Sequence, residues 1–226
     1  GYKPEEDKPF FLYLSFMNPH DICYGAGFDP RFPDKLRPHQ IAATQKYIDF
    51  HKTLSEEEYR NQIPPVPVNM EPNGAYAEMK EIGSGSRNWT EEQWNFYRWM
   101  YCRLVEDVEK QIGRILTALA DAGLADNTIV VFTSDHGEMG QSHGLVFKSQ
   151  LLEEATRTPL IIAGPGIQKG IVDSENLTCG IDLVPTMCDL VGIPIPKGLL
   201  GKSLKPILTG QSVKMSRNHI IVESSS

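Results

Sequence analysis

The spacing of hydrophobic positions predicts one long helix in the middle of the chain. Over residues 91–122, apolar residues recur every three or four positions, as on the buried face of a helix. Thr90 and Gln93 have the spacing of a capping box at the start of this helix. Gly123 suits the left-handed residue that commonly follows a helix. The sequence therefore predicts both ends of the helix as well as its body.

Short apolar runs predict three buried strands, at residues 10–17, 128–134 and 159–163. Further helices are expected over residues 149–155 and 182–191. Because the long helix leads directly into the second strand, the pattern is typical of an α/β fold.

The segment 18–89 is rich in proline and is predicted to be mostly irregular, with a short helix over 54–60 and an extended tract at 63–68. A long irregular segment in a folded domain is usually functional. We therefore expect it to form an insertion that walls a substrate cleft. Residues 211–226 form a polar tail, which we expect to be truncated.

Composition narrows the classes of function. The 226 residues allow one or two domains, and 22 Lys and Arg against 29 Asp and Glu give a net charge of −7. This sign argues against a nucleic-acid partner. No apolar run approaches the ~20 residues that a membrane-spanning helix requires. The four cysteines fit buried thiols or one or two disulfides, and the helical surroundings of Cys102 and Cys188 favour free thiols.

The strongest chemical signal follows the strand at 128–134. Asp135 and His136 are adjacent at its carboxyl end, where Gly137 permits a sharp turn, and this arrangement is typical of metal ligands at a sheet edge. A carboxylate suits a hard cation such as calcium, whereas imidazole suits zinc better. The alternatives are an ordinary turn aspartate and a histidine that bonds the sheet edge.

Lys148, twelve residues after His136, adds a positive charge to this candidate site. A metal ion and a lysine together would suit a doubly charged anion such as a sulfate or phosphate ester. The alternative is an ordinary surface lysine.

Several blocks of sequence, taken in their order along the chain, resemble the sulfatase family of the alkaline phosphatase superfamily. They are Pro9–Phe16 with Asn18-Pro19-His20-Asp21, then Ser134–Glu138, Ser142-His143-Gly144, Lys148, Glu154–Pro159, Asp182–Leu190 and Gly201–Gly210. The resemblance implies part of an alkaline phosphatase-like mixed sheet flanked by helices, with the N-terminal strands missing.

The resemblance also implies roles for individual residues. Asp135 and His136 would bind a divalent metal, expected to be Ca²⁺. Lys148 and His20 would be catalytic, since a histidine there can bind sulfate or protonate the leaving alkoxide. Lys148 and His143 would contact the substrate. The alternatives are a loop role for His20 and packing beneath the loop for His143.

Two charged residues near these blocks are expected to be structural. They are Glu138 and Arg157, and Arg157 is expected to pair with Glu153 or Glu154.

Sulfatases use a formylglycine made from the first residue of Cys/Ser-x-Pro/Ala-x-Arg, and no cysteine or serine of this chain begins that pattern. The family's Asp-Asp metal pair is also absent. We therefore expect residues 1–226 to be a partial catalytic domain without turnover of its own. The resemblance further implies a sulfated small molecule or glycan as substrate, and a periplasmic, secreted or lysosomal protein. Missing strands would leave an apolar sheet edge, which predicts self-association.

Other functions fit the same residues. A phosphodiesterase, phosphonate hydrolase or phosphoethanolamine transferase would share Ser-Asp-His-Gly and would use Zn²⁺ or Mn²⁺. Lys148 and the Thr156–Pro159 block favour a sulfatase over these relatives. A non-catalytic binding protein and a purely structural fragment are the remaining possibilities.

Overall fold

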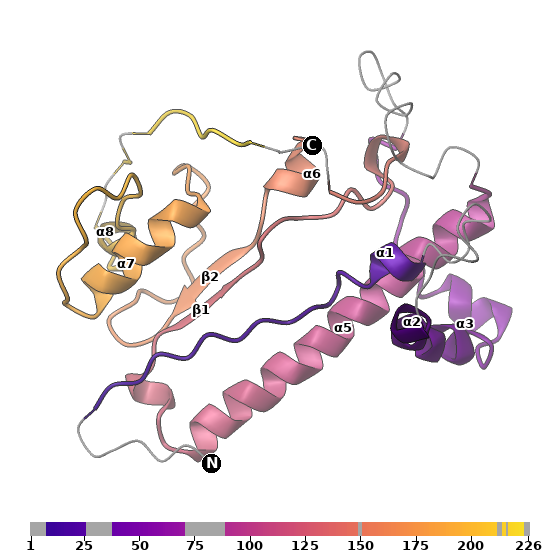
Figure 1. Ribbon diagram of the computed structural model, residues 1–226, viewed down its shortest axis with the longest axis horizontal. Coiled ribbons are helices and arrows are strands. Elements are labelled where there is room, and N and C mark those ends of the chain that lie inside the picture. The colour runs from indigo at the N-terminus through magenta and orange to yellow at the C-terminus, as the bar shows by residue number, and fades with distance from the viewer. Residues whose placement is uncertain are drawn as a thin grey trace. The chain divides into compact units, whose positions relative to one another are not determined.

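The described part of the chain is mainly helical, with one antiparallel pair of strands (Figure 1). The computed structural model describes residues 8–25, 38–70, 89–148, 151–211, 214–215 and 217–223. In chain order, the elements are α1 (Ile22–Gly25), α2 (Pro38–His51), α3 (Glu56–Arg60), α5 (Glu91–Asp121), η2 (Ala125–Asn127), β1 (Val130–Thr133), η3 (Ser142–Gly144), α6 (Glu153–Thr156), β2 (Leu160–Ala163), η4 (Gly180–Asp182), α7 (Leu183–Leu190) and α8 (Lys205–Leu208). None of the described helices is both long and apolar enough to cross a membrane.

The long helix α5 confirms the predicted helix, including its ends. The Thr90 N–H donates to Gln93 Oε1 at 2.8 Å, and the Gln93 N–H donates to Thr90 Oγ1 at 3.3 Å, which completes the capping box. Gly123 has φ +68°, the left-handed conformation expected after the last turn. These local signals define both ends of the element.

The chain divides into two compact units, each with its own core. The first unit comprises Gly1–Pro65 and Asn88–Gly113, and its core contains the fully buried Trp99 and Leu104 of α5. The second unit comprises Val66–Arg87 and Arg114–Ser226 and includes the strands. All four cysteines are free thiols, as expected.

The segment 18–89 contains more regular structure than the sequence predicted. The 14-residue helix α2 lies where irregular chain was expected. It was not predicted because its apolar positions form only a weak helical stripe. The predicted short helix at 54–60 is present as α3, which begins with a capping box between Ser55 and Glu58. Residues 71–88 of the predicted cleft wall lie outside the described residues.

The two strands occur where the sequence placed them, but they are shorter and more exposed. β1 pairs with β2 so that Val130 lies opposite Ala163 and Thr133 opposite Leu160. The two strands were expected to be buried along their whole length, and this was wrong, since Ile161 of β2 is 59% exposed. The predicted strand at 10–17 is also not formed: the chain there has no strand partner within the described ranges, and each of its residues is exposed. A strand requires a neighbour to satisfy its backbone groups.

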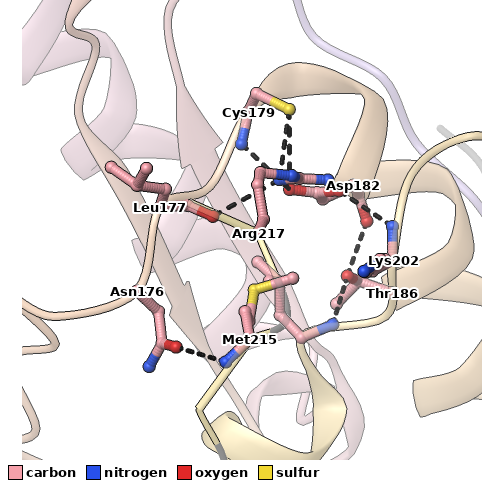
Figure 2. A network of polar contacts seen from close by, with 9 residues as sticks. Asn176, Leu177, Cys179, Asp182, Thr186, Lys202, Met215 and Arg217 are labelled. Carbon is pink, nitrogen blue, oxygen red and sulfur yellow. Dashed lines mark hydrogen bonds and ion pairs between the residues drawn. The ribbon is translucent and has the colours of Figure 1, made fainter. Parts of the chain in front are cut away.

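A buried ion pair holds the N-terminal end of α7, where Asp182 is the N-cap residue, to a part of the chain distant in sequence (Figure 2). Asp182, with no exposed surface, accepts hydrogen bonds from Arg217 Nη1 at 2.6 Å and Nη2 at 2.8 Å. The backbone N–H groups of Lys202 (2.8 Å) and Cys179 (2.9 Å) donate to the same carboxylate. A Cβ atom on Gly201 would lie 1.9 Å from the Ile181 carbonyl oxygen. Only glycine therefore lets the backbone at position 201 pass this close to the residues around Asp182.

Burial acts to raise the pKa of the Asp182 carboxyl, but the hydrogen bonds from Arg217, Lys202 and Cys179 outweigh it and lower the pKa to about 2. The unfolded carboxyl has a pKa of about 3.9. The stabilisation is therefore complete above that unfolded value and is lost as the pH falls towards about 2.

Replacing Asp182 by asparagine should destabilise the fold and remove this acid dependence. Asp182→Asn leaves the Arg217 guanidinium, whose side chain is only 12% exposed, without its charge partner. Breaking a buried ion pair costs on the order of 3 kcal/mol, measurable by urea unfolding at neutral pH. The exposed Asp126→Asn is the matched control and should change little. Equal unfolding free energies for the two variants would contradict the role given to the ion pair.

Candidate active site

The turn after β1 brings two candidate metal ligands together. The His136 N–H donates to Asp135 Oδ1 at 3.0 Å, and His136 Nδ1 lies 2.9 Å from the Gly137 carbonyl oxygen. A carbonyl oxygen can only accept, so Nδ1 carries a proton, and in the neutral ring Nε2 then has the free lone pair. Nε2 lies 3.4 Å from Asp135 Oδ2, which places two metal-binding atoms side by side.

This geometry fits a divalent cation. Fixing the imidazole through Nδ1 leaves Nε2 as the ligand atom, as is usual for metal-binding histidines. The Asp135 side chain is 86% exposed and the His136 side chain 38% exposed, so both ligand atoms are accessible. No group of three or more His, Cys, Asp or Glu residues that could hold a metal occurs within the described ranges, so the two residues of this turn would be only part of a ligand set.

The turn formed by residues 134–137, with the candidate ligands Asp135 and His136, is held against α6 by close backbone packing. The Gly137 N–H donates to the Ala155 carbonyl at 2.8 Å. A Cβ atom on Gly137 would lie 1.9 Å from the Glu154 carbonyl oxygen. Gly137, which was predicted to permit a sharp turn, is therefore required because a neighbouring helix approaches its Cα closely.

A hairpin-like loop connects His136 to Lys148. Its two sides are joined by a bond from the Met139 N–H to the Phe147 carbonyl and one from the Gln141 N–H to the Leu145 carbonyl, both at 2.9 Å. Met139 and Leu145 are buried with Ala155 in a small core. Lys148 follows this loop and is partly buried.

Glu138 has a structural contact, in line with expectation. Its Oε1 accepts the Phe147 N–H at 2.5 Å, and Phe147 adopts a positive φ of 70°. Arg157 pairs with Glu153, but at 3.6 Å and with both side chains more than three-quarters exposed, so the pair contributes little.

Two further predicted site residues, His143 and His20, lie outside the turn that carries Asp135 and His136. His143 lies at the loop tip, where its side chain is 13% exposed and faces Asn69 and Glu154. His20 belongs to the other unit, in a turn in which its N–H donates to the Met17 carbonyl at 3.0 Å. The roles of His20, Lys148, Asp135 and His136 remain predictions.

The contact between Asn69 and Glu154 was not predicted from the sequence. The Asn69 amide donates to Glu154 Oε1 at 2.6 Å across 85 residues of sequence. Asn69 lies in a segment with no periodic pattern, so no local signal marked it.

Comparison with known proteins identifies the family of this chain. The sequence matches the family described as Sulfatase over residues 1–193. The chain belongs to the sulfatase family. Sulfatases are part of the alkaline phosphatase superfamily, as the resemblance implied, and in general they use formylglycine and a divalent metal.

Individual sulfatases from animals and bacteria are similar along most of the chain. Arylsulfatase K of Danio rerio is 31% identical over 217 residues, which cover 94% of this chain and 38% of that protein. The Δ4,5-hexuronate-2-O-sulfatase of Bacteroides thetaiotaomicron is 32% identical over 219 residues, covering 96% and 43%. The chain therefore spans about two fifths of the length of these relatives.

The similar solved structures include sulfatases and phosphonate monoester hydrolases. A 2-O GAG sulfatase is 32% identical with a TM-score of 0.68, covering 90% of this chain and 42% of that one. The phosphonate monoester hydrolase of Silicibacter pomeroyi is 32% identical with a TM-score of 0.59, covering 68% and 33%. The α/β fold expected from the sequence, as part of an alkaline phosphatase-like domain, is thereby confirmed.

Two glycine-to-alanine variants test the packing of residues 134–137 against α6. Gly137→Ala should lower the unfolding free energy by about 1–3 kcal/mol, because the Cβ would collide with backbone atoms of α6. Gly113→Ala, in α5 with nothing within 4 Å of its Cβ, should raise it by about 0.5–1 kcal/mol. Urea unfolding of both variants checks the pair. A Gly137→Ala protein as stable as the parent would show that the approach is not as close as described.

Proposed function

We propose that this chain is part of a sulfuric ester hydrolase acting on sulfated carbohydrate. The single observation that carries the proposal is the paired Asp135 Oδ2 and His136 Nε2 at the end of β1, in a chain of the sulfatase family. The carbohydrate class is supported by relatives that are a hexuronate-2-O-sulfatase and a 2-O GAG sulfatase.

In the proposed enzyme, Asp135 and His136 hold a divalent cation, expected to be Ca²⁺. The ion would neutralise charge on the sulfate oxygens. Lys148 would stabilise negative charge on the sulfate or on the bridging oxygen, and His20 would protonate the departing alkoxide. His143 was predicted to contact substrate, and its inward-facing ring favours the alternative of packing beneath the loop.

The nucleophile is proposed to come from polypeptide outside these 226 residues. No formylglycine motif occurs in the sequence, and the relatives are more than twice as long as the matched region. The 226-residue chain is therefore proposed to lack turnover. By family resemblance, we propose that the whole protein is periplasmic, secreted or lysosomal.

The decisive experiment compares variants of the complete parent enzyme. Lys148→Ala should lower kcat/KM for a sulfated disaccharide on the order of 10²–10³-fold, because one charge-stabilising group is lost. Asp135→Ala should abolish turnover together with bound metal. Lys169→Ala, an exposed lysine, is the matched control and should leave the rate unchanged. Full activity of Lys148→Ala, or turnover by the 226-residue chain that Asp135→Ala abolishes, would overturn the assignment.

A phosphonate or phosphate ester hydrolase is the second candidate, favoured by the 32% identity to a phosphonate monoester hydrolase. Sulfate and phosphonate esters should be assayed side by side on the same enzyme, with its metal identified. Bound zinc or manganese and preference for the phosphonate ester would move the assignment to this candidate.

Self-association is a separate proposal about the 226-residue chain. Residues 8–17 are exposed throughout, with Phe11 77% and Tyr13 78% exposed, and an apolar surface of this kind promotes association. Light scattering should detect dimers or larger species. Phe11→Lys should reduce them, whereas Val172→Lys, at an exposed position outside the strands, should not. A stable monomer would contradict the proposal.

A further inference from the structure

Three segments that are distant in sequence meet at the tip of the loop between His136 and Lys148. The His143 N–H donates to the Asn69 carbonyl at 2.8 Å. The Asn69 side-chain nitrogen donates to Glu154 Oε1 at 2.6 Å and lies 3.3 Å from His143 Nε2. The His143 side chain is 13% exposed and the Glu154 side chain 25% exposed. These contacts are therefore shielded from water more than ordinary surface hydrogen bonds are.

The amide of Asn69 can bridge the other two side chains of this cluster. His143 Nε2 lies 3.5 Å from Glu154 Oε1. When the histidine is neutral with its proton on Nδ1, both of these atoms are acceptors, and a donor must lie between them. The Asn69 NH₂ group carries two hydrogens and can satisfy both. The bond to the carboxylate is charge-assisted and is the stronger of the two.

The cluster ties the loop to α6 at a second point. At its start, the loop is held by the bond from Gly137 to the Ala155 carbonyl. At its tip, it is held through Asn69 to Glu154 of the same helix. The backbone between these points includes left-handed residues, Gln141 with φ 84° and His143 with φ 55°, which few side chains adopt without support.

We propose that Asn69, His143 and Glu154 form a positioning cluster that holds Lys148 in place relative to the Asp135–His136 pair. The inference rests on the proposed function, in which Lys148 acts on the ester. Catalysis is sensitive to displacements of about 1 Å in a charge-stabilising group. Without the contacts at its tip, the loop would be held to α6 only by the Gly137 bond and the small core of Met139, Leu145 and Ala155, which would allow larger displacements. His143 then acts through the loop rather than by touching substrate.

Amide hydrogen exchange of the 226-residue chain tests the anchor. Asn69→Ala should speed exchange at the amides of Gln141, His143 and Leu145 about tenfold, because the tip loses its side-chain bonds. Asn218→Ala is a matched control, since Asn218 also contacts a histidine, His219, at 2.7 Å but at an exposed site. It should leave these amides unchanged. Unchanged exchange in Asn69→Ala would overturn the proposal.

A pair of substitutions at position 143 separates side-chain contact from backbone preference. Asparagine favours the left-handed conformation but is too short to place an acceptor where Nε2 lies. Glutamine can reach that point. His143→Gln should retain most of the parent chain's protection of the loop amides against exchange, whereas His143→Asn should lose it. Full protection in His143→Asn would show that backbone preference alone holds the loop, and the cluster would be rejected.

Kinetics of the complete enzyme connect the anchor to the reaction. Asn69→Ala should lower kcat about tenfold with KM and metal content nearly unchanged, as expected when a transition-state contact is misplaced. If the parent enzyme hydrolyses sulfate esters and Asn69→Ala is equally fast despite a loosened loop, the positioning role is wrong and the proposed function stands. If the parent enzyme does not hydrolyse sulfate esters, the proposed function fails, and the exchange results alone decide whether the cluster anchors the loop.

Discussion

The contact between Gly137 and α6 is the constraint on which the second unit depends. The bond to the Ala155 carbonyl and the lack of room for a side chain bring the end of β1 directly against this short helix. β2 begins four residues after α6 and returns alongside β1, so one contact connects the turn after β1, the helix and the sheet. The backbone of Asp135 and His136 is therefore fixed from two sides, by β1 and by the contact of Gly137 with α6.

Local signals in the sequence predicted what local chemistry controls. The capping box at Thr90 and the left-handed Gly123 were both correct because each is decided within a few residues. The Asp135–His136 pair was predicted to bind metal from equally local features, since a strand, two possible ligand types and a glycine are contiguous, and that role stays a prediction. The sulfatase family followed from the order of such blocks and was confirmed.

Long-range contacts could not be predicted in this way. Asn69 meets His143 across 74 residues, and Arg217 meets Asp182 across 35. Neither Asn69 nor Arg217 lies in a periodic segment, so nothing in its neighbours indicates a buried partner. The helix α2 was missed because its apolar stripe is weak, and the strand expected at 10–17 was not formed because strand pairing is a property of two segments.

The Asp182–Arg217 pair also determines how far a recombinant protein from this region must extend at its C-terminal end. The Sulfatase match ends at residue 193, yet the partner of a fully buried carboxylate lies 24 residues beyond that boundary. A recombinant protein designed to the limits of the sequence match would keep Asp182 and discard Arg217. Its buried charge would then remain uncompensated at neutral pH. The structural boundary of the second unit is therefore at least as far as Arg217, and shorter expression designs should fold poorly.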